Sequence, residues 1–209
     1  MWGKVENKKV IKIYKNPEII RDASGTQYPT AIFNNDTRLA DFSIYPITDA
    51  NLKPNIPILY SGIGESYSWN EKNSKIERTY NFSQKDLADA DAVDDKGKKV
   101  LDENGKQVIN LGIKSILKKE VKQIQASMLS NTDKWIIRKA DTGDDIPATV
   151  VTYRKSIRDT ATSMEKAITD AKDFDAIVSL LTPVLNSDDT IKTPPTLFTF
   201  PDVPDGMPD

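Results

Sequence analysis

Apolar residues recur every three or four positions along two long stretches of the C-terminal half, residues 113–129 and 146–168. The members of the two stripes are Ile113, Leu117, Val121, Ile124 and Met128, then Ile146, Val150, Tyr153, Ile157, Ala161, Met164 and Ile168. Because an α-helix turns once every 3.6 residues, each set lies on one helix face. The pattern predicts two amphipathic helices packed as an antiparallel pair. A short helix carrying Trp135 is expected in the connecting corner, with the ring buried.

The N-terminal half instead has strand-forming residues in short runs separated by polar turns. Residues 2–6 and 9–14 flank Asn7 and Lys8, and residues 66–70 and 75–82 flank a polar segment, so two hairpins are expected. Asn35 and Asp173 are suitable N-cap residues for short helices at 38–42 and 174–181.

Two eight-residue units lie in tandem at 94–101 and 102–109, with aspartates, glycines and closing apolar pairs aligned. Each unit predicts a turn followed by a short strand, because glycine adopts positive φ without strain. A calcium loop does not fit, because the positions five residues before Gly97 and Gly105 are Ala92 and Val100. Residues 183–209 hold six prolines and five aspartates, which predicts an extended tail without a central strand.

The expected fold class is therefore α+β. The expected organisation is a β-rich module (1–82), a β-arch linker with the two turn repeats (83–110), a helical module containing the antiparallel hairpin (111–182) and an extended Pro/Asp-rich tail (183–209).

Composition narrows the function. The 209 residues include no cysteine and no histidine, which excludes thiolate chemistry, disulfides and every mechanism that needs a histidine base. The net charge of −2 creates no general attraction to nucleic acid or anionic lipid. No run approaches the ~20 apolar residues that span a bilayer. We expect no nucleic-acid or membrane partner and synthesis in a cytoplasm.

No motif indicates catalysis, a cofactor or a metal. The pairs Asp94–Asp95, Asp144–Asp145 and Asp188–Asp189 fall in predicted turns, where adjacent carboxylates diverge. Lysines 114, 118, 119 and 122 form a helix face without interleaved aromatic residues, which favours a solvated surface over a nucleic-acid site. Gly62 and Gly64 lack the third glycine and the following helix of a phosphate loop. The expected protein is not an enzyme, and it needs no cofactor.

Binding is the remaining expectation. Trp2 lies close to the chain start, and Leu197, Phe198 and Phe200 are the apolar residues of a proline-rich segment. Aromatic residues are favoured in protein interfaces, so these four are the candidate interface residues.

Short motifs in both halves resemble a known group of proteins. They are Met1 to Glu6, Gln27-Tyr28-Pro29, Ile44 to Ile47, Thr132 to Trp135, Ile146-Pro147-Ala148, Tyr153 to Asp159 and Phe200-Pro201. Their order is similar to that of small tail-associated proteins of tailed bacteriophages, especially marine phages of cyanobacteria. That group shades into tail fibre assembly proteins and tail assembly chaperones. Lys134 interrupts the usual Thr-Asp-Trp, and Ile157 replaces a leucine.

The resemblance implies a non-enzymatic tail component of the virion, either fibre-associated or an adaptor, that binds other tail proteins and forms a homo-oligomer or symmetric assembly. The alternative that it implies is a fibre assembly chaperone absent from the mature particle. Its motif residues are expected to be architectural: Trp135, Pro147 and Tyr153 in helix packing, and Arg154 and Arg158 one turn apart, facing nearby carboxylates.

Overall fold

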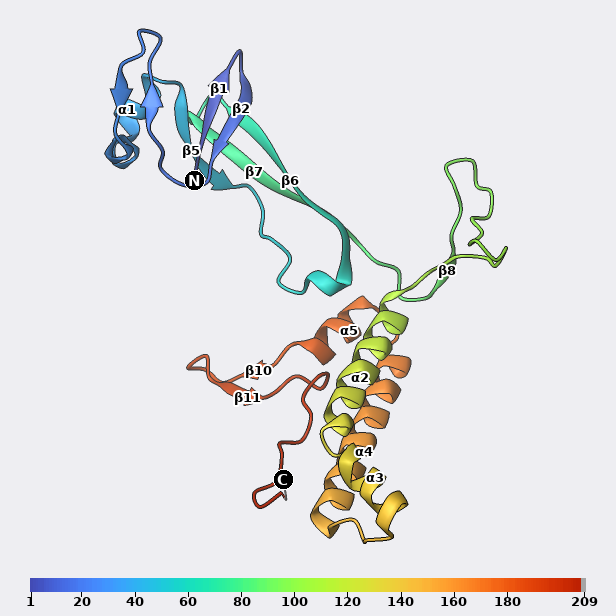
Figure 1. Cartoon of the computed structure of the whole chain (residues 1–209). Helices are drawn as coiled ribbons and strands as arrows, with labels where there is room; N and C mark the ends of the chain where they lie inside the picture. Colours follow the sequence, from blue (N-terminus) through green and yellow to red (C-terminus); the bar gives the residue numbers. More distant parts are fainter. Residues whose placement is uncertain (208–209) are drawn as a thin grey trace. The chain divides into compact units, whose positions relative to one another are not determined.

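The computed structural model describes residues 1–207 and shows a mixed α+β protein (Figure 1). Two compact units meet in the sequence between Lys85 and Asp86. The first unit thus extends three residues past the predicted boundary at 82. Residues 86–110 and the proline-rich segment group with the helices.

The first unit is built on a five-stranded sheet in the order β2-β1-β5-β7-β6. Its strands are β1 (Trp2–Glu6), β2 (Lys9–Tyr14), β5 (Ile44–Asp49), β6 (Tyr60–Asn70) and β7 (Lys75–Gln84). Both predicted hairpins are confirmed, and the second one is longer than expected. The pairing of β5 with β7 is parallel, and no local pattern indicated it.

One face of the β1–β2–β5 part of the sheet is covered by short elements. These are β3 (Ile20–Arg21), β4 (Gln27–Tyr28), the 3-10 helix η1 (Thr30–Asn34) and α1 (Asp36–Ala40); a second 3-10 helix, η2 (Pro57–Leu59), precedes β6. The buried side chains gathered there are Tyr14, Ile20, Ile32, Phe33, Leu39 and Ile44. Asn35 caps α1 as predicted, by accepting a hydrogen bond from the Arg38 N–H at 3.1 Å.

The opposite face is curled inward. Gly3 lies against Ile76, where a Cβ on Gly3 would stand 2.5 Å from Cδ1 of Ile76. The rings of Tyr45 and Trp69 lie 4.3 Å apart, and Cα atoms of the edge strands β2 and β6 come within 8 Å of each other. The small residue at position 3 therefore permits the sheet to close partly around Ile76.

The second unit contains α2 (Ile113–Ser130), α3 (Asp133–Thr142), α4 (Ala148–Asp170) and α5 (Phe174–Leu181). Lys114 Nζ, near the start of α2, donates to the Thr169 carbonyl near the end of α4, whereas Arg154 near the start of α4 reaches the Leu129 carbonyl near the end of α2. The two helices are therefore antiparallel. Asp173 caps α5 as predicted. No helix among residues 1–207 is long and apolar enough to cross a membrane.

Two pairs of short strands complete the second unit (Figure 1). They are β8 (Ala90–Asp91) with β9 (Ile109–Asn110), and β10 (Val184–Leu185) with β11 (Ile191–Thr193). The segment after Pro183 thus begins with a hairpin. The high proline content of the segment predicted an extended tail, but these prolines start only at Pro194, after the end of β11.

Candidate functional site

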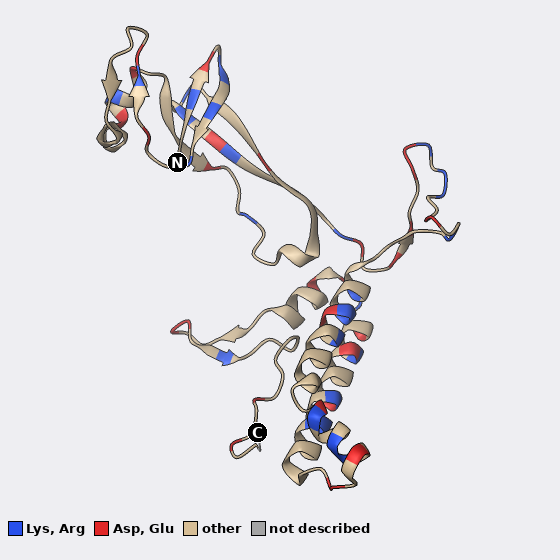
Figure 2. Cartoon of the chain, viewed as in Figure 1, with Lys and Arg blue, Asp and Glu red and all other residues tan. Residues whose placement is uncertain are grey.

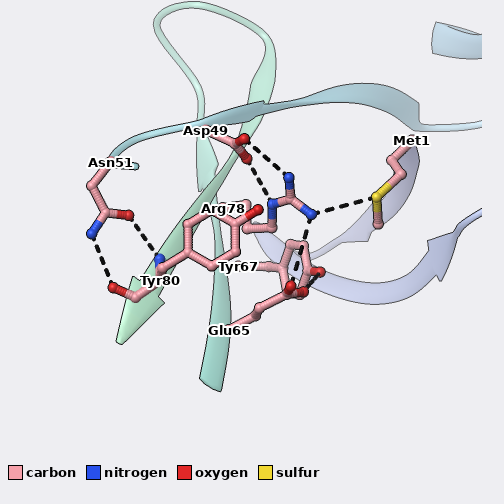
Figure 3. A network of polar contacts seen from close by, with 7 residues as sticks. All are labelled: Met1, Asp49, Asn51, Glu65, Tyr67, Arg78 and Tyr80. Atoms are coloured by element: carbon pink, nitrogen blue, oxygen red, sulfur yellow. Dashed lines mark hydrogen bonds and ion pairs between the residues drawn. The ribbon is translucent and has the colours of Figure 1, made fainter. Parts of the chain in front are cut away.

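A polar cluster that connects several strands of the first unit centres on Arg78 of β7 (Figure 3). Its guanidinium donates two hydrogen bonds to the Asp49 carboxylate, from Nε to Oδ1 at 2.6 Å and from Nη2 to Oδ2 at 3.0 Å. Nη1 lies 3.8 Å from Oε1 of Glu65 and 3.6 Å from Sδ of Met1. The Tyr67 hydroxyl donates to Glu65. The cluster therefore joins β5, β6, β7 and the first residue.

The electrostatics of this cluster indicate a structural role, and we call Arg78 with Asp49, Glu65 and Tyr67 the brace. The hydrogen bond from Arg78 holds the pKa of Asp49 below its usual range. Burial, followed by the bond to Glu65, raises the pKa of Tyr67. Nearby, the Asn51 amide brackets the backbone of Tyr80, accepting from its N–H and donating to its carbonyl. Since Arg78 is occupied by its own chain, the cluster acts by holding strands together.

Acidification is expected to weaken this brace. Because the folded pKa of Asp49 is depressed, its contribution is complete above the unfolded pKa of about 3.9 and is lost as pH falls through the folded value. Asp49→Asn should therefore lower the melting temperature at pH 6, and this deficit should become smaller as the pH falls below about 3.9. Thermal melts of both proteins across this range provide the measurement.

The matched control is Glu71→Gln, which removes an ion pair with Lys8 in which both side chains are about 70% exposed. Such a pair contributes little, so this variant should melt like wild type. A deficit of Asp49→Asn that stayed constant as the pH fell would show that lost packing, and not charge, causes it.

A groove of about 890 Å³ in the same unit lies beside β1, β2 and residues 18–23 and 41–44. Its wall carries both charge signs, including Lys12 paired with Glu18, and Asp22, whose pKa is lowered mainly by a hydrogen bond from Ser24. The mixed lining selects no ionic ligand.

Arg154 organises the corner of the helical unit. Its side chain is about nine-tenths buried, and Nη1 donates to the Leu129 carbonyl, to Oγ1 of Thr132 and to Oδ1 of Asp133 at 2.7–2.8 Å. Arg154 thus pairs with a nearby carboxylate, as the sequence suggested. Arg158, one turn later, is exposed and has no ion pair among the described residues.

Trp135 does not occupy the buried corner that was predicted for it. The ring is only half-buried, α3 has no buried residue, and the Lys134 and Arg138 side chains lie over the ring at 5.9 and 5.8 Å. The corner is filled by Arg154 and Thr132, while Tyr153 is buried on α4. Trp135 instead borders a cavity of about 260 Å³ with Tyr153, Val203 and Met207. Pro147 immediately precedes α4, and its carbonyl accepts from the Val151 N–H.

The two Asp/Gly units form nearly identical turns, as predicted. In the first, Oδ1 of Asp94 accepts the N–H groups of Lys96 and Lys98, both at 2.9 Å. In the second, Oδ1 of Asp102 accepts two N–H groups at the same distance. Gly97 and Gly105 have φ of 75° and 77°, so each turn uses the freedom of its glycine. Asp22 and Gly25 repeat the same bonds in the first unit.

A ring of backbone hydrogen bonds holds these turns together. Val100 donates to Ala92, Val108 donates to Val100, and Ala92 donates to Val108, at 2.8–2.9 Å. The three residues are eight positions apart, so the ring is a pseudo-threefold junction. We call residues 90–110 the arm. Three antiparallel strand pairs radiate from this junction, two closed by the turns and the third formed by β8 and β9.

Apolar side chains are exposed on the arm and on the β10–β11 hairpin. Leu101 and Val93 are each 55% exposed, and Val184, Leu185 and Ile191 are similarly open. Figure 2 shows β10 without charged residues, a basic residue on β11 and acidic residues at the turn between the two strands. Exposed apolar side chains gathered on projecting strands are typical of protein-binding surfaces.

The four candidate interface residues lie differently from expectation. Leu197 is only 1% exposed, and its N–H donates to the Leu180 carbonyl at 2.9 Å, so it packs within its own chain. Trp2 packs edge-on against Phe33, with ring centroids 5.0 Å apart. Phe198 and Phe200 are half-buried. Leu197 therefore offers no surface to a partner, and Trp2 supports the core of the first unit.

Sequence reasoning missed the exposed apolar residues of the arm, although their signal was present. Val93, Leu101 and Ile109 follow one another at intervals of eight, the spacing of the turn repeat. Leu101 and Ile109 close the two aligned units, whereas Val93 lies just before the first unit, so only Val93 requires the junction to be recognised.

Within residues 1–207, no group of three or more acidic side chains is arranged to hold a metal. The acidic doublet at 144–145 instead pairs with α3, Asp144 with Arg138 and Asp145 with Lys139, each at 3.0 Å. No protein-family model, curated protein or solved structure matches this chain.

Proposed function

We propose that this chain is a non-enzymatic binding protein of a bacteriophage tail, acting as a fibre-associated or adaptor component. One structural observation supports binding: apolar side chains are exposed on two projecting strand pairs, the arm and the β10–β11 hairpin. The tail assignment rests on the sequence resemblance. In this proposal, the β-rich module, the antiparallel helical hairpin and the C-terminal segment are separate parts of one adaptor.

The alternative in the same setting is a chaperone that assists fibre folding and then leaves. Exposed apolar residues suit either role, since both require a surface for another chain. The two roles differ in whether the protein stays in the particle.

Mass spectrometry of gradient-purified particles of the encoding phage tests the proposal. We expect the protein in the virion, in multiples that match a symmetric tail. Its absence from infectious particles, together with recovery bound to fibre protein from infected cells, would favour the chaperone. Absence from both fractions would overturn the tail assignment.

A variant that tests binding within particles should keep Leu197. Deleting residues 190–209 would not do so, because it would also remove this buried core side chain. Ile191→Lys is the better variant, since the side chain is 62% exposed.

A further inference from the structure

One face of the arm carries six side chains, which are arranged around the pseudo-threefold junction. Residues paired across antiparallel strands point to the same face of a sheet, and neighbours along a strand alternate. The pairs are Val93 with Lys99, Leu101 with Gln107, and Ile109 with Asp91. All six therefore share a face, and Ala92, Val100 and Val108 lie on the other.

Contacts within the chain agree with this assignment. Lys99 Nζ lies 3.5 Å from Oδ2 of Asp91, as expected for two side chains on the same face. Gln107 Nε2 donates to the Ala92 and Val108 carbonyls at the junction. Val93, Leu101 and Ile109 are 55%, 55% and 43% exposed, so the three apolar members of this face are uncovered.

The order of the six residues makes the face self-complementary. Around the junction they run Asp91, Val93, Lys99, Leu101, Gln107, Ile109. A twofold axis lying in the face along the line from Val93 to Gln107 matches every position when two copies stack. Val93 meets Val93, Leu101 meets Ile109, and Lys99 meets Asp91, while Gln107, whose amide is bonded to its own junction, lies on the axis.

We propose that this face of the arm is a homodimer interface, in which a second copy of the chain stacks about that twofold axis. Twofold contacts use the same patch on both copies, and opposite charges that meet across an interface fix its register. The single lysine and single aspartate balance each other, whereas a partner of one charge sign would leave one of them opposed by like charge. This inference does not depend on the tail assignment.

Three apolar side chains cover less than the roughly 800 Å² per partner of a stable complex. We therefore expect a weak dimer, with a dissociation constant of roughly 100 μM. Such an interface works where several copies are already held close together.

Sedimentation velocity of the full chain over a concentration series tests the interface. Leu101→Lys should weaken association at least tenfold. Val100→Lys is the matched control on the adjacent residue, which faces the other side, and it should associate like wild type. Equal effects of the two variants, or a wild-type chain that stays monomeric at about 1 mM, would overturn the proposal.

A charge-exchange experiment tests the register of the dimer. Its readout is a gain of association in a mixture of two variants, so it does not depend on a loss of association in one variant. Asp91→Lys places two ammonium groups on the face, and Lys99→Asp places two carboxylates, so each variant alone should stay monomeric. An equimolar mixture should form heterodimers, seen by native mass spectrometry. A mixture that remains monomeric while wild type dimerises would show that another surface is used.

Discussion

Arg154→Ala is expected to lower the free energy of unfolding of the helical unit by about 2–4 kcal/mol. The substitution removes three hydrogen bonds made by one buried guanidinium nitrogen and leaves the Leu129 carbonyl and Thr132 without that donor. It also opens a cavity where the side chain was packed. Urea denaturation followed by circular dichroism at 222 nm isolates this unit, because the long helices all lie after Asp86.

Arg158→Ala is the matched control. The two arginines are one turn apart on α4, but Arg158 is exposed and has no ion pair among residues 1–207. An exposed substitution of this kind changes stability by about 0.5 kcal/mol or less. If both variants were equally destabilised, helix propensity and not the buried contacts would account for the loss.

Gly112→Ala is expected to destabilise the same unit by about 3 kcal/mol or more. Gly112 precedes α2, and a Cβ there would lie 2.3 Å from the Ala88 carbonyl oxygen and 2.7 Å from that of Leu87. Both are backbone atoms. They belong to the segment whose carbonyls accept from Ile113 and Lys114, and Asp89 accepts from the Gly112 N–H. The segment must move away, and the start of α2 then loses these acceptors.

Gly97→Ala separates steric overlap from backbone strain. Gly97 has φ of 75° but no atom within 4 Å of an added Cβ, so alanine there should cost only about 1 kcal/mol. The same denaturation curves compare the two variants. A Gly112→Ala protein no less stable than Gly97→Ala would show that residues 86–89 give way easily and do not anchor the helix.

The elements that were correctly predicted depend on residues close together in sequence. The polar turn at Asn7 and Lys8, the caps at Asn35 and Asp173, and the Asp/Gly turns each form from a few consecutive residues. The long helices were predicted from their apolar stripes for the same reason, since the period of an α-helix is a local property. These features would be expected in any fold that contains the same segments.

The predictions about the candidate site failed where distant segments meet. Apolarity alone indicated that Leu197 would be buried somewhere, but not that it would be buried in its own chain. Trp135 has the large apolar side chain that is typical of a core residue. Arg154 nevertheless fills the corner, because its long side chain reaches three acceptors where α2 joins α3. A pattern of types does not specify which of several apolar or charged residues reaches a given position.

By itself, the sequence determined the helices, the two hairpins of the first unit, the Asp/Gly turns and the absence of cysteine and histidine chemistry. The tertiary structure alone decided the parallel pairing of β5 with β7, the partial closure of the sheet around Ile76 and the ring that joins Ala92, Val100 and Val108. The physical reason is that these contacts bring together segments that no local rule relates. Which segments meet depends on how the whole chain offsets its loop-closure entropy by burying surface.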